Sequence, residues 1–241
     1  MVGGLCLLLL VVGTQATARP LAAAASASVA TVSAGGNDNA YATVAFADDG
    51  EETLDEFVDE VIRAVNRYWA AEFKQRGRAY HPPKVVRAHA KQRIRSKCGN
   101  SRGAEHSYCN LDETVFLDMD SDDVDAFETL WDDDRAFVIV TTVGHEWGHH
   151  VQTLLGVFDV DEHSVETENQ ADCLMGVFAR AYTKSSDWLG QADFRDAIED
   201  TRESGDDPDT PADERTHGTP DERVEAFLRG YNGKKMEACG L

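Results

Sequence analysis

The sequence has few positively charged side chains. Its 23 lysines and arginines stand against 44 aspartates and glutamates, so the formal net charge is -21 at pH 7. A field of this sign repels the phosphates of nucleic acids and the headgroups of anionic lipids. We therefore expect neither a nucleic acid nor an anionic membrane as a partner of this protein.

The first 50 residues have very little charge and no apolar run long enough to cross a bilayer. The run from Leu5 to Val12 is far shorter than the roughly 20 residues that a spanning helix needs. Small residues follow it, and Ala16-Thr17-Ala18 is of the kind that signal peptidase accepts. We predict a signal peptide over residues 1–18 and a flexible leader over 19–50. The protein is then secreted or held at the cell surface, without membrane insertion of the mature form.

No lysine or arginine precedes the apolar run, although signal peptides usually carry one. The alternative is a protein anchored to the membrane by an uncleaved N-terminal segment.

Four cysteines follow the predicted signal peptide, an even number in a chain that we expect to be exported. Of the three possible pairings we favour Cys98 with Cys109, which closes a local loop. Cys173 would then pair with Cys239 and tie the C-terminus to a central helix. Four reduced thiols are the alternative.

Hydrophobic spacing predicts one mainly helical domain over residues 51–241. Apolar residues recur every three or four positions from Leu54 to Phe73, which indicates a helix, and Thr53 with Glu56 forms a capping box at its start. Short strands are expected at 85–88 and 114–118.

Further helices are expected from Ala136, over 165–182, over 192–203 and from Pro220. The β-branched residues of 136–143 also suit a buried strand, but we favour a helix. For the last helix, Thr219 is the predicted cap, with Glu222 three residues later, and Gly230 the predicted end.

The segment His145-Glu146-Trp147-Gly148-His149 is the candidate catalytic centre. Its histidines stand four residues apart, so on a helix both rings project from one face and can chelate one zinc ion. Glu146 is the next residue around the helix, where its carboxylate can take a proton from water on the ion and pass it to a leaving amine. The pattern predicts metal-assisted hydrolysis, with one zinc ion per chain and Glu146 as general base.

Catalytic zinc sites use three protein ligands, and the helix expected over 165–182 supplies candidates for the third. We choose Glu168. Asp172, one turn later on the same face, can accept the second ring proton of a ligating histidine and fix its tautomer. Glu162 and Glu166 compete for the third position, but Glu166 points about 200° around the helix from Glu168.

The segments HEWGHHVQ (145–152) and ENQADC (168–173) together resemble the bacterial neutral zinc metallopeptidase family, of gluzincin type. Shorter matches extend the likeness to roughly residues 53–240, without the leader: Tyr80 to Pro83, Cys98-Gly99, Tyr108-Cys109, Val115 to Asp118, Thr216 to Thr219, and Arg223-Val224. The resemblance implies an α+β, predominantly helical, zincin-like domain with a small β-sheet over the active-site helix. It also implies peptide-bond hydrolysis by one zinc ion held by His145, His149 and Glu168.

Enzymes of gluzincin type use a distant His, Tyr or Arg to stabilise the tetrahedral oxyanion, which suggests this role for His217 if its loop folds over the metal. A capping or exposed loop histidine is the alternative. His150 lies about 100° around the helix from His149, so we expect it to pack or form hydrogen bonds rather than bind metal. The remaining histidines fit no ligand spacing: His81, His89, His106 and His163.

We expect a secreted zinc endopeptidase that acts on peptide or protein substrates. One alternative is a catalytically silent, zinc-stabilised binding protein, which the presence of Glu146 opposes. Another is a non-peptidase metallohydrolase such as a deformylase, which would need a cysteine ligand, and Cys109 is the only nearby candidate. The segment 115–117 is either an edge strand that binds an extended substrate or a core strand.

Overall fold

The computed structural model describes residues 54–88, 93–102, 106–119, 136–158, 164–185 and 191–241. The predicted signal peptide, the leader and the Thr53 cap lie outside these residues. Within the described ranges, no helix combines the length and the apolar character that crossing a membrane requires.

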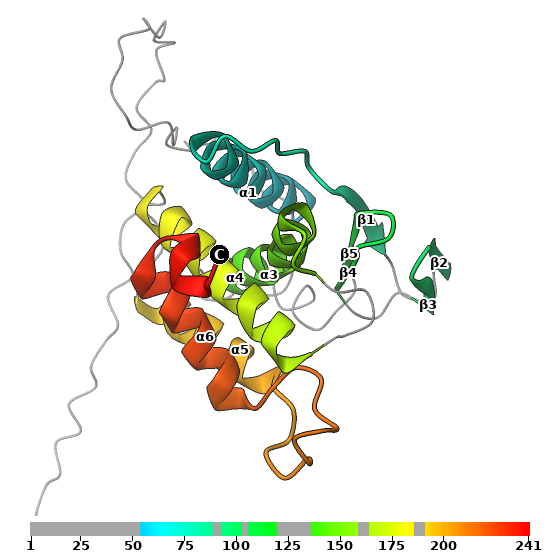
Figure 1. The fold of residues 1–241 in the computed structure, drawn as a ribbon, viewed down its shortest axis with the longest axis vertical. Helices are drawn as coiled ribbons and strands as arrows, with labels where there is room; N and C mark the ends of the chain where they lie inside the picture. The colour runs from blue at the N-terminus through cyan, green and yellow to red at the C-terminus, as the bar shows by residue number, and fades with distance from the viewer. Residues whose placement is uncertain (1–53, 89–92, 103–105, 120–135, 159–163, 186–190) are drawn as a thin grey trace, which may run out of the picture.

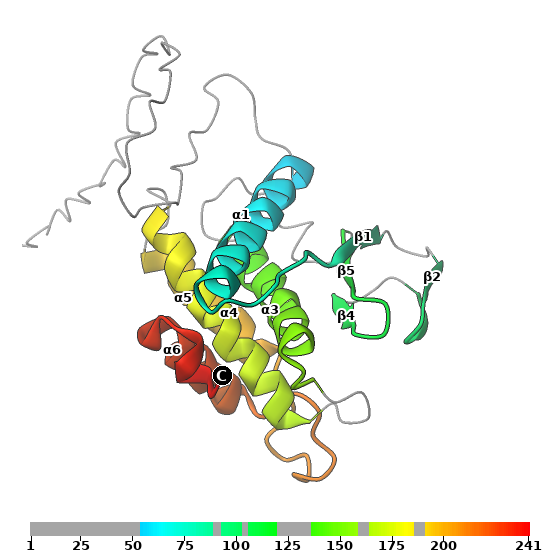
Figure 2. The ribbon, with the colours of Figure 1, turned by 45° about the horizontal axis from the view of Figure 1, so that its top comes forward.

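Helices make up most of the described structure, as the hydrophobic spacing predicted (Figure 1). They are α1 (Leu54–Gln75), α3 (Ala136–Leu155), α4 (Val165–Ser185), α5 (Gln191–Glu203) and α6 (Pro220–Gly233), followed by a short 3-10 turn, η1 (Met236–Cys239). Helix α4 packs between α3 and α6, and α1 lies across α3 and α4 (Figures 1 and 2). The β-branched stretch at 136–143 is therefore helical, because it is buried among these helices rather than paired with a strand.

Helix α1 buries the apolar face that its sequence predicts. Of the apolar residues at helical spacing, only Ile62 is partly exposed, and Trp69 and Phe73 are enclosed in the main core. Complete burial of one large apolar side chain contributes roughly 1.5 to 3 kcal/mol. This face therefore anchors α1 on α3 and α4.

A small mixed sheet packs on α3, beside the helices (Figure 2). Its strand order is β1 (Lys84–Ala88), β5 (Thr114–Asp118), β4 (Ser107–Cys109), with β1 parallel and β4 antiparallel to β5. A separate two-stranded hairpin joins β2 (Arg93–Ser96) to β3 (Gly99–Arg102). The fold is thus α+β and predominantly helical, with a small sheet over the helix that carries the candidate site.

Strand β5 is the central strand, and every residue in it is buried. Its backbone pairs with β1 along its whole length on one side and with β4 at residues 114–116 on the other, so β5 is not an edge strand among the described strands. The edge-strand interpretation of 115–117 was therefore wrong, and the core-strand interpretation is confirmed.

Helix α6 begins as predicted but ends later. The Thr219 side chain accepts from the Glu222 N–H and the Glu222 carboxylate accepts from the Thr219 N–H, so the capping box is present. The helix passes Gly230 and ends at Gly233, where Lys234 takes a left-handed conformation. The predicted end was wrong because Gly230 serves packing: a Cβ there would lie 1.8 Å from the carbonyl oxygen of Cys173 on α4.

Two disulfides join Cys98 to Cys109 and Cys173 to Cys239, which confirms the favoured pairing. The second ties η1 to the middle of α4. Its cysteines are separated by 66 positions in the sequence, and in the chain-entropy account a loop of this length stabilises the folded protein by about 4 kcal/mol.

We predict that Gly230→Ala destabilises the protein by about 1 to 3 kcal/mol or more, since the new methyl group must push α6 away from α4. Alanine normally stabilises a helix more than glycine does. The predicted loss of stability therefore comes from the collision with the backbone of α4 at Cys173. Chemical denaturation measures the change. Arg229→Ala, on the exposed side of the same turn, is the control and should stay within about 0.5 kcal/mol of wild type.

Candidate metal centre

The predicted catalytic residues lie in the C-terminal half of α3, which approaches α4 very closely. A Cβ added to Gly148 would lie 2.9 Å from the carbonyl oxygen of Ala171 and 3.0 Å from its Cα. Only glycine allows this approach without moving the backbone of α4. The contact brings Glu168 and Asp172, on the facing side of α4, up to the histidines of α3.

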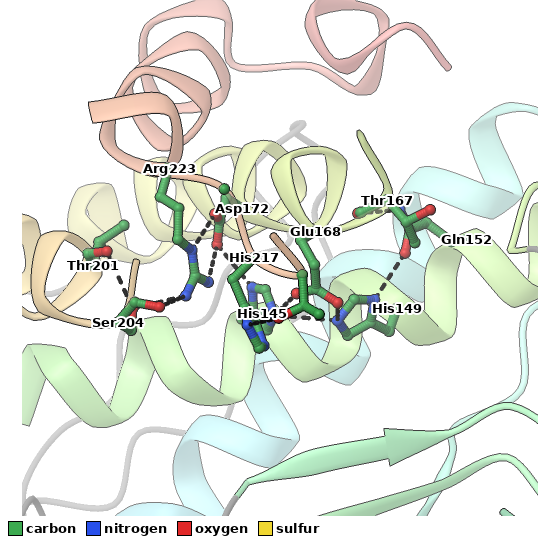
Figure 3. Close-up of polar contacts among 12 residues, drawn as sticks. His145, His149, Gln152, Thr167, Glu168, Asp172, Thr201, Ser204, His217 and Arg223 are labelled. Atoms are coloured by element: carbon green, nitrogen blue, oxygen red, sulfur yellow. Dashed lines mark hydrogen bonds and ion pairs between the residues drawn. The ribbon is translucent and has the colours of Figure 1, made fainter. Parts of the chain in front are cut away.

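His145, His149 and Glu168 point toward one another (Figure 3). The two Nε2 atoms are 3.1 Å apart, His145 Nε2 is 3.2 Å from Glu168 Oε2, and His149 Nε2 is 3.4 Å from Glu168 Oε1. Ligands about 2.0 to 2.1 Å from a tetrahedral zinc ion are separated from one another by about 3.3 to 3.4 Å. The donor set and its spacing therefore fit one zinc ion.

Glu146 follows His145 on α3, and its side chain points into the protein interior. Its side chain is buried, with 5% of its surface exposed, and its Oε2 has no hydrogen-bond partner within the described part of the chain. A buried carboxylate oxygen is rarely left without a partner in a native structure. This oxygen can therefore accept a hydrogen bond from a water molecule or a substrate.

The carboxylate of Asp172 orients His145. His145 Nδ1 donates to Asp172 Oδ1 at 2.8 Å, so the Nε2 atom faces the ligand group. Arg223 of α6 holds the same carboxylate with two bonds of 2.8 Å, from Nε and Nη2, and its Nη1 donates to the carbonyl oxygen and hydroxyl of Ser204 (Figure 3). Burial alone would raise the pKa of Asp172, but the bonds from Arg223 and His145 outweigh it and lower the pKa. Sequence reasoning identified Asp172 and missed the role of Arg223, which lies 51 residues away.

The second histidine has a different partner, which sequence reasoning also missed. His149 Nδ1 lies 2.9 Å from Gln152 Oε1, and the Gln152 amide donates to the Thr167 carbonyl and to Gln170. Gln152 is one turn after His149 on α3, so the signal in the sequence was its helical spacing.

His150 is fully buried and links α3 to the sheet and to the loop before β1. Its Nε2 donates to the His81 carbonyl at 2.8 Å, so its Nδ1 accepts from the Tyr108 hydroxyl at 3.0 Å. Burial lowers the pKa of His150, and the ring is neutral near pH 7. This confirms a hydrogen-bonding role for His150 in place of metal binding.

His81, Glu113 and His150 form a second group of possible ligands, which the sequence spacing did not indicate. His81 pairs with the Glu113 carboxylate through Nε2. Because both ring nitrogens of His150 are already engaged, this group is a polar network, and we assign no metal to it.

His217 lies in the loop before α6. Its backbone N–H and those of Thr216 and Gly218 donate to Asp206 Oδ2, and its ring is half exposed beside the Thr216 hydroxyl. Figure 3 shows His217 in the same view as His145, but the hydrogen bonds of His217 are with Asp206 and Thr216. A role for His217 in stabilising an oxyanion stays a prediction.

The structure disfavours two of the three competing ligands, and the third stays untested. Glu166 is exposed on α4, Glu162 lies outside the described residues, and Cys109 is bonded to Cys98. Cysteine ligation of the deformylase kind is therefore unavailable to the site in the disulfide-bonded protein.

Comparison with known proteins identifies a family of zinc metallopeptidases. The sequence model of the family described as "Putative neutral zinc metallopeptidase" matches residues 2–241. The chain belongs to this family. The match also covers the first 50 residues, so the likeness is wider than the 53–240 that the motifs indicated.

Proteins similar in sequence to this chain occur in Escherichia coli and Mycobacterium tuberculosis. "Uncharacterized protein YpfJ" of Escherichia coli K12 is 27% identical over 209 residues, which cover 78% of this chain and 71% of the relative. "Uncharacterized protein Rv2575" of Mycobacterium tuberculosis H37Rv is 31% identical over 156 residues, 55% of this chain and 53% of the relative. No solved structure matches the chain.

We predict that zinc binding releases about one proton per chain at pH 7. Burial lowers the pKa of His145, but the hydrogen bonds and charges of Asp172 and Glu168 outweigh it and raise the pKa to about 10. The zinc-free protein thus holds this proton at pH 7, and the metal needs the bare nitrogen. Apparent zinc affinity should therefore increase with pH up to about 10. Calorimetry in buffers of different ionisation enthalpy counts the protons, and a count of zero would contradict the prediction.

Proposed function

We propose that this protein is an exported, zinc-dependent endopeptidase with a zincin-like active site. The observation that carries the proposal is the ligand group of His145, His149 and Glu168, with the unpartnered carboxylate oxygen of Glu146 on the same helix as the histidines. Family membership supports a zinc metallopeptidase of this general kind.

His145, His149 and Glu168 would hold a zinc ion with three protein ligands, the number typical of catalytic rather than structural sites. A zinc ion held there would lower the pKa of a water molecule bound to it and polarise the carbonyl of the peptide bond. Glu146 then accepts the proton of the attacking water on its Oε2 and donates it to the leaving amine. Asp172 and Arg223 hold His145 in place throughout.

The disulfides are compatible with an oxidising compartment and so with export. We propose the signal peptide over residues 1–18 on the sequence alone. Substrates would be peptides or unfolded protein segments, and the acidic surface of the protein would disfavour strongly acidic ones.

We predict that Glu146→Gln retains the metal and loses about 100-fold to 10,000-fold in the rate of peptide cleavage, because the amide cannot accept the proton. Cleavage of an unstructured reporter peptide and zinc content should be measured on the same preparation. A variant that cleaves as fast as wild type would exclude Glu146 as the base. If wild type itself holds zinc and cleaves nothing, the protein is a zinc-stabilised binding protein instead.

Glu168→Ala should lower zinc occupancy strongly, because one of three ligands is lost. The matched control is Glu166→Ala, which removes an exposed carboxylate two residues earlier on α4 and should keep full occupancy. Zinc content after dialysis against a weak chelator measures both. Equal occupancy in the two variants would exclude Glu168 as the third ligand.

A further inference from the structure

His149 can bind zinc through Nε2 only if its single ring proton sits on Nδ1. At His145 the acceptor for this proton is a carboxylate, Asp172. At His149 it is the neutral side chain of Gln152, 2.9 Å from Nδ1 and with only 1% of its surface exposed. An amide presents either an oxygen or an NH₂ group, so its orientation decides which tautomer His149 adopts.

Backbone carbonyls determine the orientation of both glutamines. The Gln152 atom that lies 2.8 Å from the Thr167 carbonyl must be the nitrogen, because a carbonyl only accepts. The Gln170 atom that lies 3.0 Å from the Cys239 carbonyl must be the nitrogen for the same reason. The Gln170 oxygen then accepts the second N–H of Gln152 at 3.0 Å. Gln152 is left with its oxygen toward His149 (Figure 3).

The outer end of this chain of bonds is held covalently. Cys239 lies in η1, near the C-terminus, and its disulfide to Cys173 fixes it to α4, the helix that also carries Gln170. The Thr167 carbonyl is in the first turn of α4. Both anchors thus belong to rigid parts of the fold.

We propose that Gln152 and Gln170 are positioning residues that hold His149 as the Nδ1–H tautomer, with its Nε2 lone pair directed to the metal. The inference rests on the zinc site of the proposed function. Gln152 acts directly on His149, while Gln170 acts by preventing the Gln152 amide from turning over. The C-terminal segment is therefore connected to the candidate metal centre through hydrogen bonds, without direct contact with the ligands.

The tautomer can be observed in the zinc-free protein. Long-range proton–nitrogen NMR correlation on ¹⁵N-histidine-labelled protein distinguishes the two forms, and the His149 signals are assigned by their loss in His149→Gln. We expect the Nδ1–H form in wild type and a mixture or the Nε2–H form in Gln152→Leu. Gln152→Glu should restore the Nδ1–H form, because a carboxyl oxygen in either protonation state can accept from His149. A Nδ1–H form that persists in Gln152→Leu overturns the inference.

Zinc affinity gives a second, independent measurement. Removal of a partner that orients a ligand typically costs about 10-fold to 100-fold in metal affinity, which we expect for Gln152→Leu. Gln170→Leu should cost less, at most about 10-fold, since Thr167 still restrains the Gln152 amide. Wild-type affinity in Gln152→Leu would count against the inference.

A control separates this effect from general loss of stability. Thr141 is buried on the same helix, and its hydroxyl bonds only to carbonyls of α3. Thr141→Val removes a buried hydroxyl whose hydrogen bonds go to the Phe137 and Val138 carbonyls and not to the proposed ligands, so zinc affinity and the His149 signals should match wild type. Loss of affinity in Thr141→Val equal to that in Gln152→Leu would assign the effect to folding and overturn the role of Gln152.

The measurements distinguish a wrong proposed function from a wrong role for Gln152. If wild type binds no zinc, the function is wrong, and the tautomer comparison still decides whether Gln152 orients His149. If wild type binds zinc and cleaves peptide while Gln152→Leu keeps both its affinity and its tautomer, the proposed function stands and the positioning role of Gln152 is wrong.

Discussion

The buried carboxylate of Asp172 is the interaction on which the rest of the structure depends. It is completely enclosed, and a charge in that position is tolerable only when opposite charge and hydrogen bonds surround it. Arg223 supplies a two-pronged bond from α6, and His145 supplies a third bond from α3. Ser204, just beyond α5, binds the same arginine. One carboxylate thus joins the helices that surround the metal centre.

Close packing makes this arrangement possible. Helix α4 meets α3 at Gly148 and α6 at Gly230, and at both contacts a single methyl group would collide with backbone. The two glycines keep the neighbouring helices near enough for short side chains to reach across. The Cys173–Cys239 disulfide adds a covalent bond between α4 and η1, next to Asp172 in sequence. The helices that carry the ligands are therefore held at a fixed separation, which a chelating site requires.

The two histidines of the candidate metal centre hydrogen-bond to partners of different chemistry. His145 hydrogen-bonds to the ionised carboxylate of Asp172, and His149 hydrogen-bonds to the neutral amide of Gln152. The carboxylate raises the proton affinity of its histidine, while the amide fixes a tautomer without adding charge. Two carboxylates in these positions, together with Glu146 and Glu168, would gather four negative charges in one buried region. A neutral amide behind His149 adds no charge and so limits the free-energy cost of burying like charges together.

Local rules were enough to predict the helices, the capping box at Thr219, strands close to 85–88 and 114–118, and a group of side chains that could hold a metal, because each depends on residues close in the chain or on fixed helical spacing. Motif likeness added the family. Three features depended on tertiary contacts and were missed or misjudged: the central place of β5, the passage of α6 through Gly230, and the roles of Arg223 and Gln170. The sequence by itself determined which side chains can bind zinc and move a proton. Only the tertiary structure decided which distant residues orient them, because a hydrogen bond between separate elements leaves no periodic pattern in the chain.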